Sequence, residues 1–175
     1  LSSSSAASDV YKRQVWDHST FRQDMLGRLR RTSLFVAGTS YGGRHDAEQL
    51  IDKVRRIHLQ VVGQAPDGRA YAATDPGLLT WVHVSEVSQF LAGYLRYVDP
   101  ELPVAEQDRY YREVALIAER LGAQGVPKSS QATGDYLERM RPQLLCDERT
   151  REVVRLLYTA CLLYTSDAAD EEDSV

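Results

Sequence analysis

Apolar residues recur at three- and four-residue steps along most of the chain, which is the spacing of one helical face. The strongest such stripe runs from Asp46 to Val62 and stops at Gly63, a residue type that commonly ends helices. No run of alternating apolar and polar residues is long enough to build a sheet, although Tyr71–Ala73 could form a short extended piece. An all-α fold is therefore predicted, with helices over Gly27–Ala37, Asp46–Val62, Pro76–Tyr97, Ala105–Leu121, Thr133–Arg141 and Asp147–Ala160.

Local signals place several of these helix ends. Asp75 can cap free amides and Pro76 suits the first helical position, so a helix should begin there. Gly122 marks an end, and Asp67–Gly68 marks a tight turn. The residues of the third helix expected to face the core are Leu79, Val82, Val87, Phe90, Leu91 and Tyr94. Aromatic residues expected in the core rather than at a substrate are Trp81, Tyr110 and Tyr111.

Both ends of the chain read as translated sequencing adaptor. Asp9–Gln14 spells D-V-Y-K-R-Q, the translation of a transposase mosaic end used in library construction, and Cys161–Ser166 is its reverse complement in a shifted frame. Such segments are excluded from fold reasoning. We therefore expect residues 1–14 and 161–175 to be artefact, and residues 15–160 to be part of one catalytic domain that is truncated at both ends.

Charge and cysteine content then exclude several classes of protein. The net charge of -4 arises from 21 basic and 25 acidic residues, of which two basic and six acidic ones lie in the adaptor-like ends, leaving 19 of each. An electrically balanced domain has no basic footprint for nucleic acid. Cys146 is the one cysteine outside those ends, so no internal disulfide or cysteine-based metal cluster is expected. No stretch is long and apolar enough to span a bilayer.

Two histidines stand out by position. His58 lies on the apolar stripe of the second helix, and His83 lies on the helix that begins at Pro76. A neutral imidazole on an apolar helical surface suits the proximal ligand of a haem iron, because the porphyrin is buried and the axial nitrogen must be unprotonated. From the residues alone, however, a core role satisfied by packing is the commoner fate of such a histidine. For His83, packing is the favoured reading over proximity to haem or a two-histidine metal site with His58.

Short motifs in a fixed order resemble the latex-clearing-protein and MpaB-type oxygenase family. The resemblance covers Asp17 to about Leu145. The motifs are H-S-x-F at His18–Phe21, G-R-L-R-R-T at Gly27–Thr32, G-T at Gly38–Thr39, V-x-x-I-H-x-x-V-x-G at Val54–Gly63, D-G-R-x-Y-x-A-x-D-P at Asp67–Pro76, L-L-x-W-V-H at Leu78–His83 and R-Y-Y-x-E at Arg109–Glu113.

The resemblance implies an all-helical bundle that holds haem b, with an Arg-x-x-x-Thr motif beside the porphyrin. This motif matches Arg28 and Thr32, and the family's iron-ligating histidine matches His58. Residues four apart share a helical face, so both side chains can enter one pocket. Where the best-known members carry a lysine before the threonine, this chain has Arg31, which stays protonated and cannot coordinate iron. Without the resemblance, Arg28 and Arg31 could equally form a solvated basic face with Arg30.

Two function classes follow. The first is a haem-dependent oxygenase in which Arg28 and Thr32 assist and His58 binds the iron, so that dioxygen attacks an apolar substrate such as the double bond of an isoprenoid chain. An electron donor is a further partner of this class, and a cytoplasmic location is the expectation. The second class is a non-catalytic helical module that binds haem or lipid, because fold resemblance alone does not settle activity.

Overall fold

The structure is a computed structural model of the whole chain that describes residues 24–64, 70–144, 148, 150–156 and 158–159. Helices dominate these residues, which confirms the predicted all-α fold. Only a short two-stranded sheet interrupts them. In chain order the elements are α2 (Met25–Tyr41), α3 (Arg44–Gln60), β1 (Val62–Gln64), β2 (Ala70–Ala72), α4 (Pro76–Tyr97), α5 (Val104–Leu121), α6 (Ser130–Met140) and the short 3₁₀ helix η1 (Arg141–Gln143).

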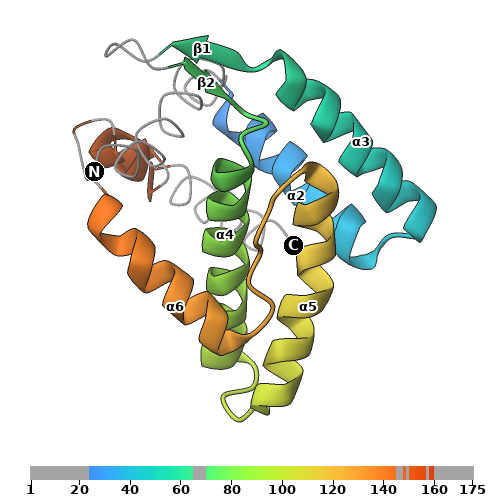
Figure 1. Cartoon of the computed structure of the whole chain (residues 1–175), viewed down its shortest axis with the longest axis vertical. Coiled ribbons are helices and arrows are strands. Elements are labelled where there is room, and N and C mark those ends of the chain that lie inside the picture. The colour runs from blue at the N-terminus through green and yellow to red at the C-terminus, as the bar shows by residue number, and fades with distance from the viewer. Residues whose placement is uncertain (1–23, 65–69, 145–147, 149, 157, 160–175) are drawn as a thin grey trace, which may run out of the picture.

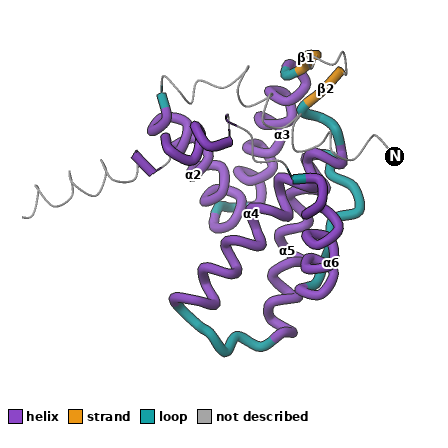
Figure 2. The backbone as a smooth tube through the Cα atoms, turned by 90° about the vertical axis from the view of Figure 1, so that its left-hand side faces the viewer, coloured by secondary structure: helices purple, strands orange, loops and turns teal. Residues whose placement is uncertain are grey.

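The helices form two groups around α4 (Figure 1). α4 packs against α5 and α6, which also contact each other. α2 and α3 form a hairpin through Gly42 and Gly43, and α3 joins the first group by packing against α5. Figure 2 shows the same arrangement from the side, with the small sheet beyond one end of α3.

Side-chain caps explain where these helices begin. Asp75 accepts a hydrogen bond from the Leu78 amide at 2.8 Å, so α4 starts at Pro76 as predicted. Ser129 accepts one from the Ala132 amide at 3.2 Å. This cap starts α6 at Ser130, three residues before the expected position.

Glycines mark two helix ends in different ways. α5 ends at Gly122, whose φ of 111° is a left-handed conformation that favours glycine. α3 ends at Gln60, so Gly63 does not cap it and instead lies in β1 opposite Tyr71 of β2. A Cβ atom at position 63 would lie 2.4 Å from the Tyr71 ring. Gly63 therefore permits the close packing of the buried tyrosine, which the sequence did not reveal.

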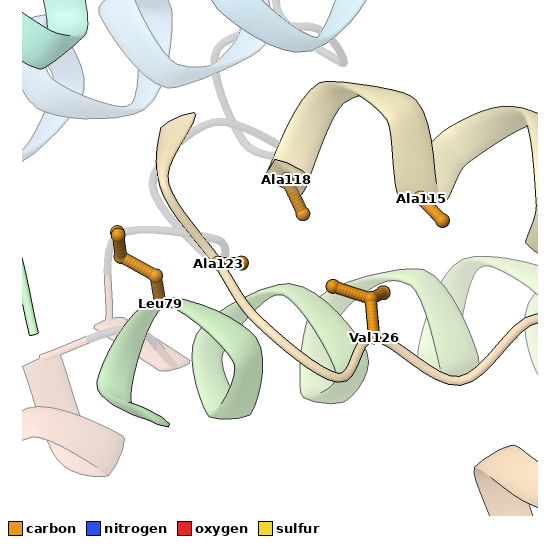
Figure 3. Packing of buried hydrophobic residues seen from close by; sticks show 5 residues of the cluster. All are labelled: Leu79, Ala115, Ala118, Ala123 and Val126. Carbon is orange, nitrogen blue, oxygen red and sulfur yellow. The ribbon is translucent and has the colours of Figure 1, made fainter. Parts of the chain in front are cut away.

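The central core is a cluster of small and branched side chains between α4, α5 and the loop after α5. Figure 3 shows its members, which are Leu79, Ala115, Ala118, Ala123 and Val126. Ala115 is fully buried, so α5 approaches its neighbours closely there. A buried hydroxyl supports the same contact, because Thr80 on α4 lies 2.8 Å from the carbonyl oxygen of Gln124.

A second cluster lies further along α4, where Val87 and Leu91 pack against Tyr111 of α5. Tyr111 is buried as expected, and Tyr110 and Trp81 are partly buried. Phe90 and Tyr94 were predicted to face the core, but half of Phe90 and 44% of Tyr94 are exposed. Among the described residues, the neighbouring elements therefore leave about half of each of these two side chains uncovered.

Some predictions fall on residues that the structure does not describe. These are the turn at Asp67–Gly68, Cys146, His18 and the adaptor-like ends. The helix predicted over 147–160 is helical at residues 150–156. Among the helices of the described ranges, none is both long and apolar enough to cross a membrane.

Candidate functional site

α2 carries the predicted Arg-x-x-x-Thr motif on its N-terminal half. Asp24 caps the helix by accepting a hydrogen bond from the Gly27 amide at 2.8 Å. Arg28 follows in the first turn and is partly buried, whereas Thr32 is exposed. Arg31 lies on the solvent side, where it pairs with Asp24 at 3.3 Å and both side chains are more than half exposed. None of the described side chains of α2 is fully buried by the other described residues.

α3 presents His58 in its last turn. Ile51 is the buried residue of this helix, and His58 lies two turns further along the same apolar stripe. The Nδ1 atom of His58 is buried and has no hydrogen-bond partner among the described residues. Burial lowers the pKa of His58 from its usual 6.5, which keeps the ring neutral at pH 7. The side chain therefore has the charge state that metal ligation requires.

The α2–α3 hairpin brings the motif and His58 to the same end of the molecule. Arg28 and Thr32 lie near the start of α2 and His58 near the end of α3, and the two helices run antiparallel and pack together (Figure 1). A Cβ atom at Gly38 would lie 2.3 Å from the Leu50 side chain, so glycine lets α3 approach the backbone of α2. The structure thus brings together the helices that carry the three predicted residues.

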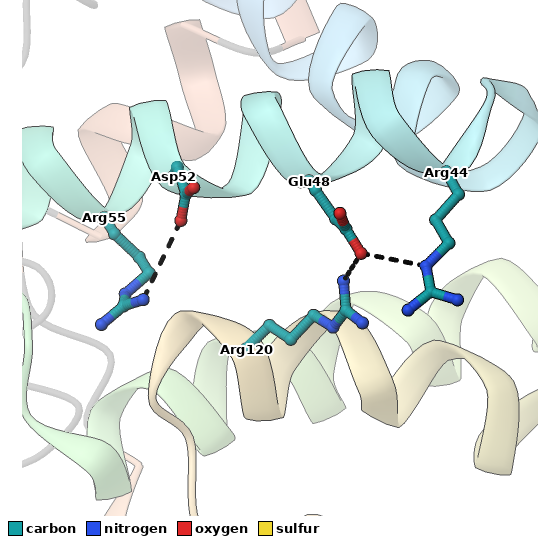
Figure 4. Close-up of polar contacts among 5 residues, drawn as sticks. All are labelled: Arg44, Glu48, Asp52, Arg55 and Arg120. Atoms are coloured by element: carbon teal, nitrogen blue, oxygen red, sulfur yellow. Dashed lines mark hydrogen bonds and ion pairs between the residues drawn. The ribbon is translucent and has the colours of Figure 1, made fainter.

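Glu48 holds the hairpin against the central group of helices. Its Oε1 atom accepts hydrogen bonds from Arg44 at 3.0 Å and from Arg120 of α5 at 2.7 Å (Figure 4). The hydrogen bond from Arg120, followed by that from Arg44, lowers the pKa of Glu48. Asp52 and Arg55 on the next turn form a looser ion pair of 3.9 Å within α3. The contact between Glu48 and Arg120 joins α3 to α5 at the surface, where the two helices pack together.

Burial lowers the pKa of His83 on α4 more strongly than that of His58. Its Nε2 atom is buried and has no hydrogen-bond partner among the described residues. Burial lowers its pKa from 6.5 to about 4. Packing alone was the favoured interpretation of His83, but a packed core histidine normally satisfies its ring nitrogens. His83 is therefore a second residue in the described structure whose unsatisfied nitrogen calls for a functional explanation.

Glu86 is the residue that sequence reasoning missed. It lies one turn after His83 on the same face of α4, is partly buried, and makes no hydrogen bond or ion pair within the described residues. Burial raises the pKa of Glu86 above its usual 4.5. Tyr110 of α5 lies close by and donates to the carbonyl oxygen of Val87 at 3.2 Å. Residue spacing alone gave no signal for Glu86, because a lone glutamate on a helix normally faces solvent.

The potential metal ligands among the described residues are single histidine nitrogens and not a cluster of side chains. Within the described ranges, no group of three or more histidine, cysteine, aspartate or glutamate side chains could hold a bare metal ion. His58 and His83 are each neutral, and each could serve a site that needs only one histidine nitrogen as a ligand. His45 is exposed, and its Nε2 atom lies 2.9 Å from the Gln49 side-chain amide.

Comparison with known proteins identifies one family. The family model described as "ER-bound oxygenase mpaB/B'/Rubber oxygenase, catalytic domain" matches residues 4–169. No curated protein and no solved structure matches the chain. The matched range includes most of both adaptor-like ends, whose artificial origin stays a prediction.

Proposed function

The chain belongs to the family of MpaB and rubber-oxygenase catalytic domains, and we propose that it is a haem b-dependent oxygenase that acts on an apolar substrate. The oxygenase class follows from the family. Haem and the substrate class are our inference from the resemblance and from the chemistry of His58, Arg28 and Thr32. An isoprenoid chain with a reactive double bond is the substrate that this resemblance favours.

The observation that carries the proposal is the state of His58. One ring nitrogen is buried without a partner, and burial keeps its pKa low, so the ring is neutral and uncommitted to any hydrogen bond among the described residues. Axial ligation of haem iron needs a neutral imidazole whose nitrogen is free. His58 fits this requirement.

Arg28 and Thr32 would act on the polar groups of the site. The guanidinium of Arg28 can hold a propionate or stabilise negative charge that develops during reaction with dioxygen. The hydroxyl of Thr32 can orient a bound group through one hydrogen bond. Their four-residue spacing puts both side chains on one face of α2, where Arg28 is partly buried and Thr32 is exposed.

Haem would supply the dioxygen chemistry, while the protein provides ligation, orientation and a pocket that excludes water. In that division, His58 binds, Arg28 and Thr32 orient, and the apolar residues around α4 keep the region dry. Arg31 is occupied by Asp24 on the solvent side and cannot serve as an iron ligand.

Absorption spectroscopy tests the proposal on the full chain, in the longest form that its gene encodes, after expression with added haem. We expect a Soret band that shifts with carbon monoxide after reduction, since one axial position must be open. The absence of this band from a haem-replete preparation would reject the proposal.

Paired variants then test the ligand. His58→Ala should lose the Soret band while far-ultraviolet circular dichroism stays unchanged, and the surface variant His45→Ala should keep both. Loss of the band in His83→Ala, with retention in His58→Ala, would transfer the ligand role to His83.

A further inference from the structure

The face of α4 that contains Glu86 changes in character along its length. His83, Glu86, Phe90 and Tyr94 follow one another at three- and four-residue steps, so they share this face. The first two are partly buried polar residues, and the last two are aromatic residues that are about half exposed. An aromatic surface therefore leads to the buried, unpartnered Nε2 atom of His83 and to the partly buried carboxyl group of Glu86.

Partial burial of Glu86 without a partner is unfavourable for a structural residue. A carboxylate that loses part of its hydration without gaining a counter-charge is destabilised, so such groups are normally paired. The exposed carboxylates of this protein are commonly paired, as Glu48 is with Arg120 and Glu113 with Arg109. Glu86 has neither an arginine nor a lysine at bonding distance within the described residues, so its placement points to a role other than stability.

The titratable groups described near Glu86, His83 and Tyr110, are both uncharged at neutral pH. His83 on the same helix is neutral, since its pKa lies at about 4. Tyr110 on α5 is also neutral, because burial first, and then Tyr111, Glu86 and Tyr41, raise its pKa to about 12. With the pKa of Glu86 itself raised by burial, the carboxyl group holds its proton closer to neutral pH than an exposed glutamate does.

We propose that Glu86 is a proton-exchanging residue of the oxygenase site and that it acts from the face of α4 that it shares with His83. This inference rests on the proposed function. In the step, the O–H bond of the Glu86 carboxylic acid breaks, and an O–H bond forms on an oxygen atom that gains negative charge during the reaction. The remaining carboxylate takes a proton back from solvent, so no electrons are exchanged.

Infrared titration tests the proton-holding state without requiring turnover. The full chain should show one protonated carboxyl band that persists to higher pH than those of the other glutamates. Glu86→Gln should remove this band, and Glu101→Gln, which changes an exposed loop carboxylate in the same way, should keep it. A band that titrates with the others, or that survives in Glu86→Gln, would overturn the inference.

Oxygen uptake with squalene as the probe substrate tests the role in turnover. Glu86→Gln should lower the rate about 100-fold or more, a loss typical of removing a general acid–base group, and should remove one limb of the pH profile. Glu86→Asp should restore that limb, and Glu101→Gln should match the parent protein. The Soret band should be the same in all four proteins.

The outcomes separate the two proposals. A parent protein without a Soret band overturns the haem-dependent function, and this inference with it. A parent protein that binds haem and consumes oxygen with squalene, while Glu86→Gln shows the same pH profile, overturns only the role of Glu86.

Discussion

Thr80 and Gln124 hydrogen-bond to each other in both directions, although 44 residues separate them. The Thr80 hydroxyl lies 2.8 Å from the Gln124 carbonyl oxygen and accepts from the Gln124 amide at 3.2 Å. The same hydroxyl lies 2.8 Å from the carbonyl oxygen of Pro76. One side chain therefore ties the start of α4 to the loop between α5 and α6.

Thr80→Val should destabilise the protein by about 1–3 kcal/mol, because valine keeps the shape but leaves the Gln124 backbone groups unsatisfied. Thr80 is only 2% exposed, so water cannot readily replace the lost bonds. Urea denaturation measures the change. Thr80→Ser retains the hydroxyl and should lose less than Thr80→Val, and the reverse order would contradict this account.

Ala115→Leu should cost about 1–3 kcal/mol, because a larger side chain cannot fit where α5 meets α4 without moving backbone. Ala115 is fully buried in the central cluster. The same substitution at exposed Ala105, on the first turn of α5, should change the free energy of unfolding by less than about 0.5 kcal/mol. Equal effects at the two positions would show that the tight contact is absent.

The buried imidazole of His83 should make the fold acid-sensitive. Its pKa is about 4 in the folded protein against 6.5 when exposed, so the unfolded state binds more protons between these values. Stability should therefore fall as pH drops from about 6.5 to about 4, by on the order of 3 kcal/mol in total. Denaturation across this range should show a shallower slope in His83→Gln, and an unchanged slope in the surface variant His45→Gln.

The contact between Glu48 and Arg120 should be weak and sensitive to salt. Both side chains are largely exposed, so a double-mutant cycle of Glu48→Gln and Arg120→Gln should give a small coupling that disappears in concentrated salt. Because Arg120 lowers the pKa of Glu48, the coupling should be present above pH 4.5 and be lost as pH falls through the lowered value. A coupling that resists both treatments would indicate a more buried contact.

Removal of the Arg28 guanidinium should weaken the proposed oxygenase activity without unfolding the protein. Arg28→Gln should lower oxygen uptake with squalene by about 100-fold if the side chain stabilises developing charge, as loss of one such donor does in other enzymes. Arg30→Gln, on an exposed position of the same helix, is the matched control. Equal rates in both variants would remove Arg28 from the site.

Helix positions were predictable where a local chemical signal fixed them. Asp75 with Pro76 set the start of α4, and Gly122 set the end of α5, because capping and backbone conformation are decided by neighbouring residues. The exposure of Phe90 was not predictable in the same way. Residue spacing identifies an apolar face, but whether another helix covers that face depends on tertiary packing.

The candidate site shows the same difference between residues that a local pattern identifies and residues that only tertiary packing identifies. The position of His58 on an apolar stripe could be read from spacing, and its burial agrees with that reading. The importance of Glu86 could not be read from spacing, because a lone glutamate on a helix normally faces solvent. Only the packing of α5, with Tyr110 beside Val87, shows that this carboxyl is partly buried and unpaired among the described residues.

The missing side chain at Gly38 has a consequence for how the site is assembled. Because the Leu50 side chain occupies the space that a Cβ atom would need, α3 packs directly against the backbone of α2 at this point. The two helices that carry Arg28 and His58 are therefore packed together before any ligand arrives. Such preorganisation means that binding need not spend energy on aligning the two helices.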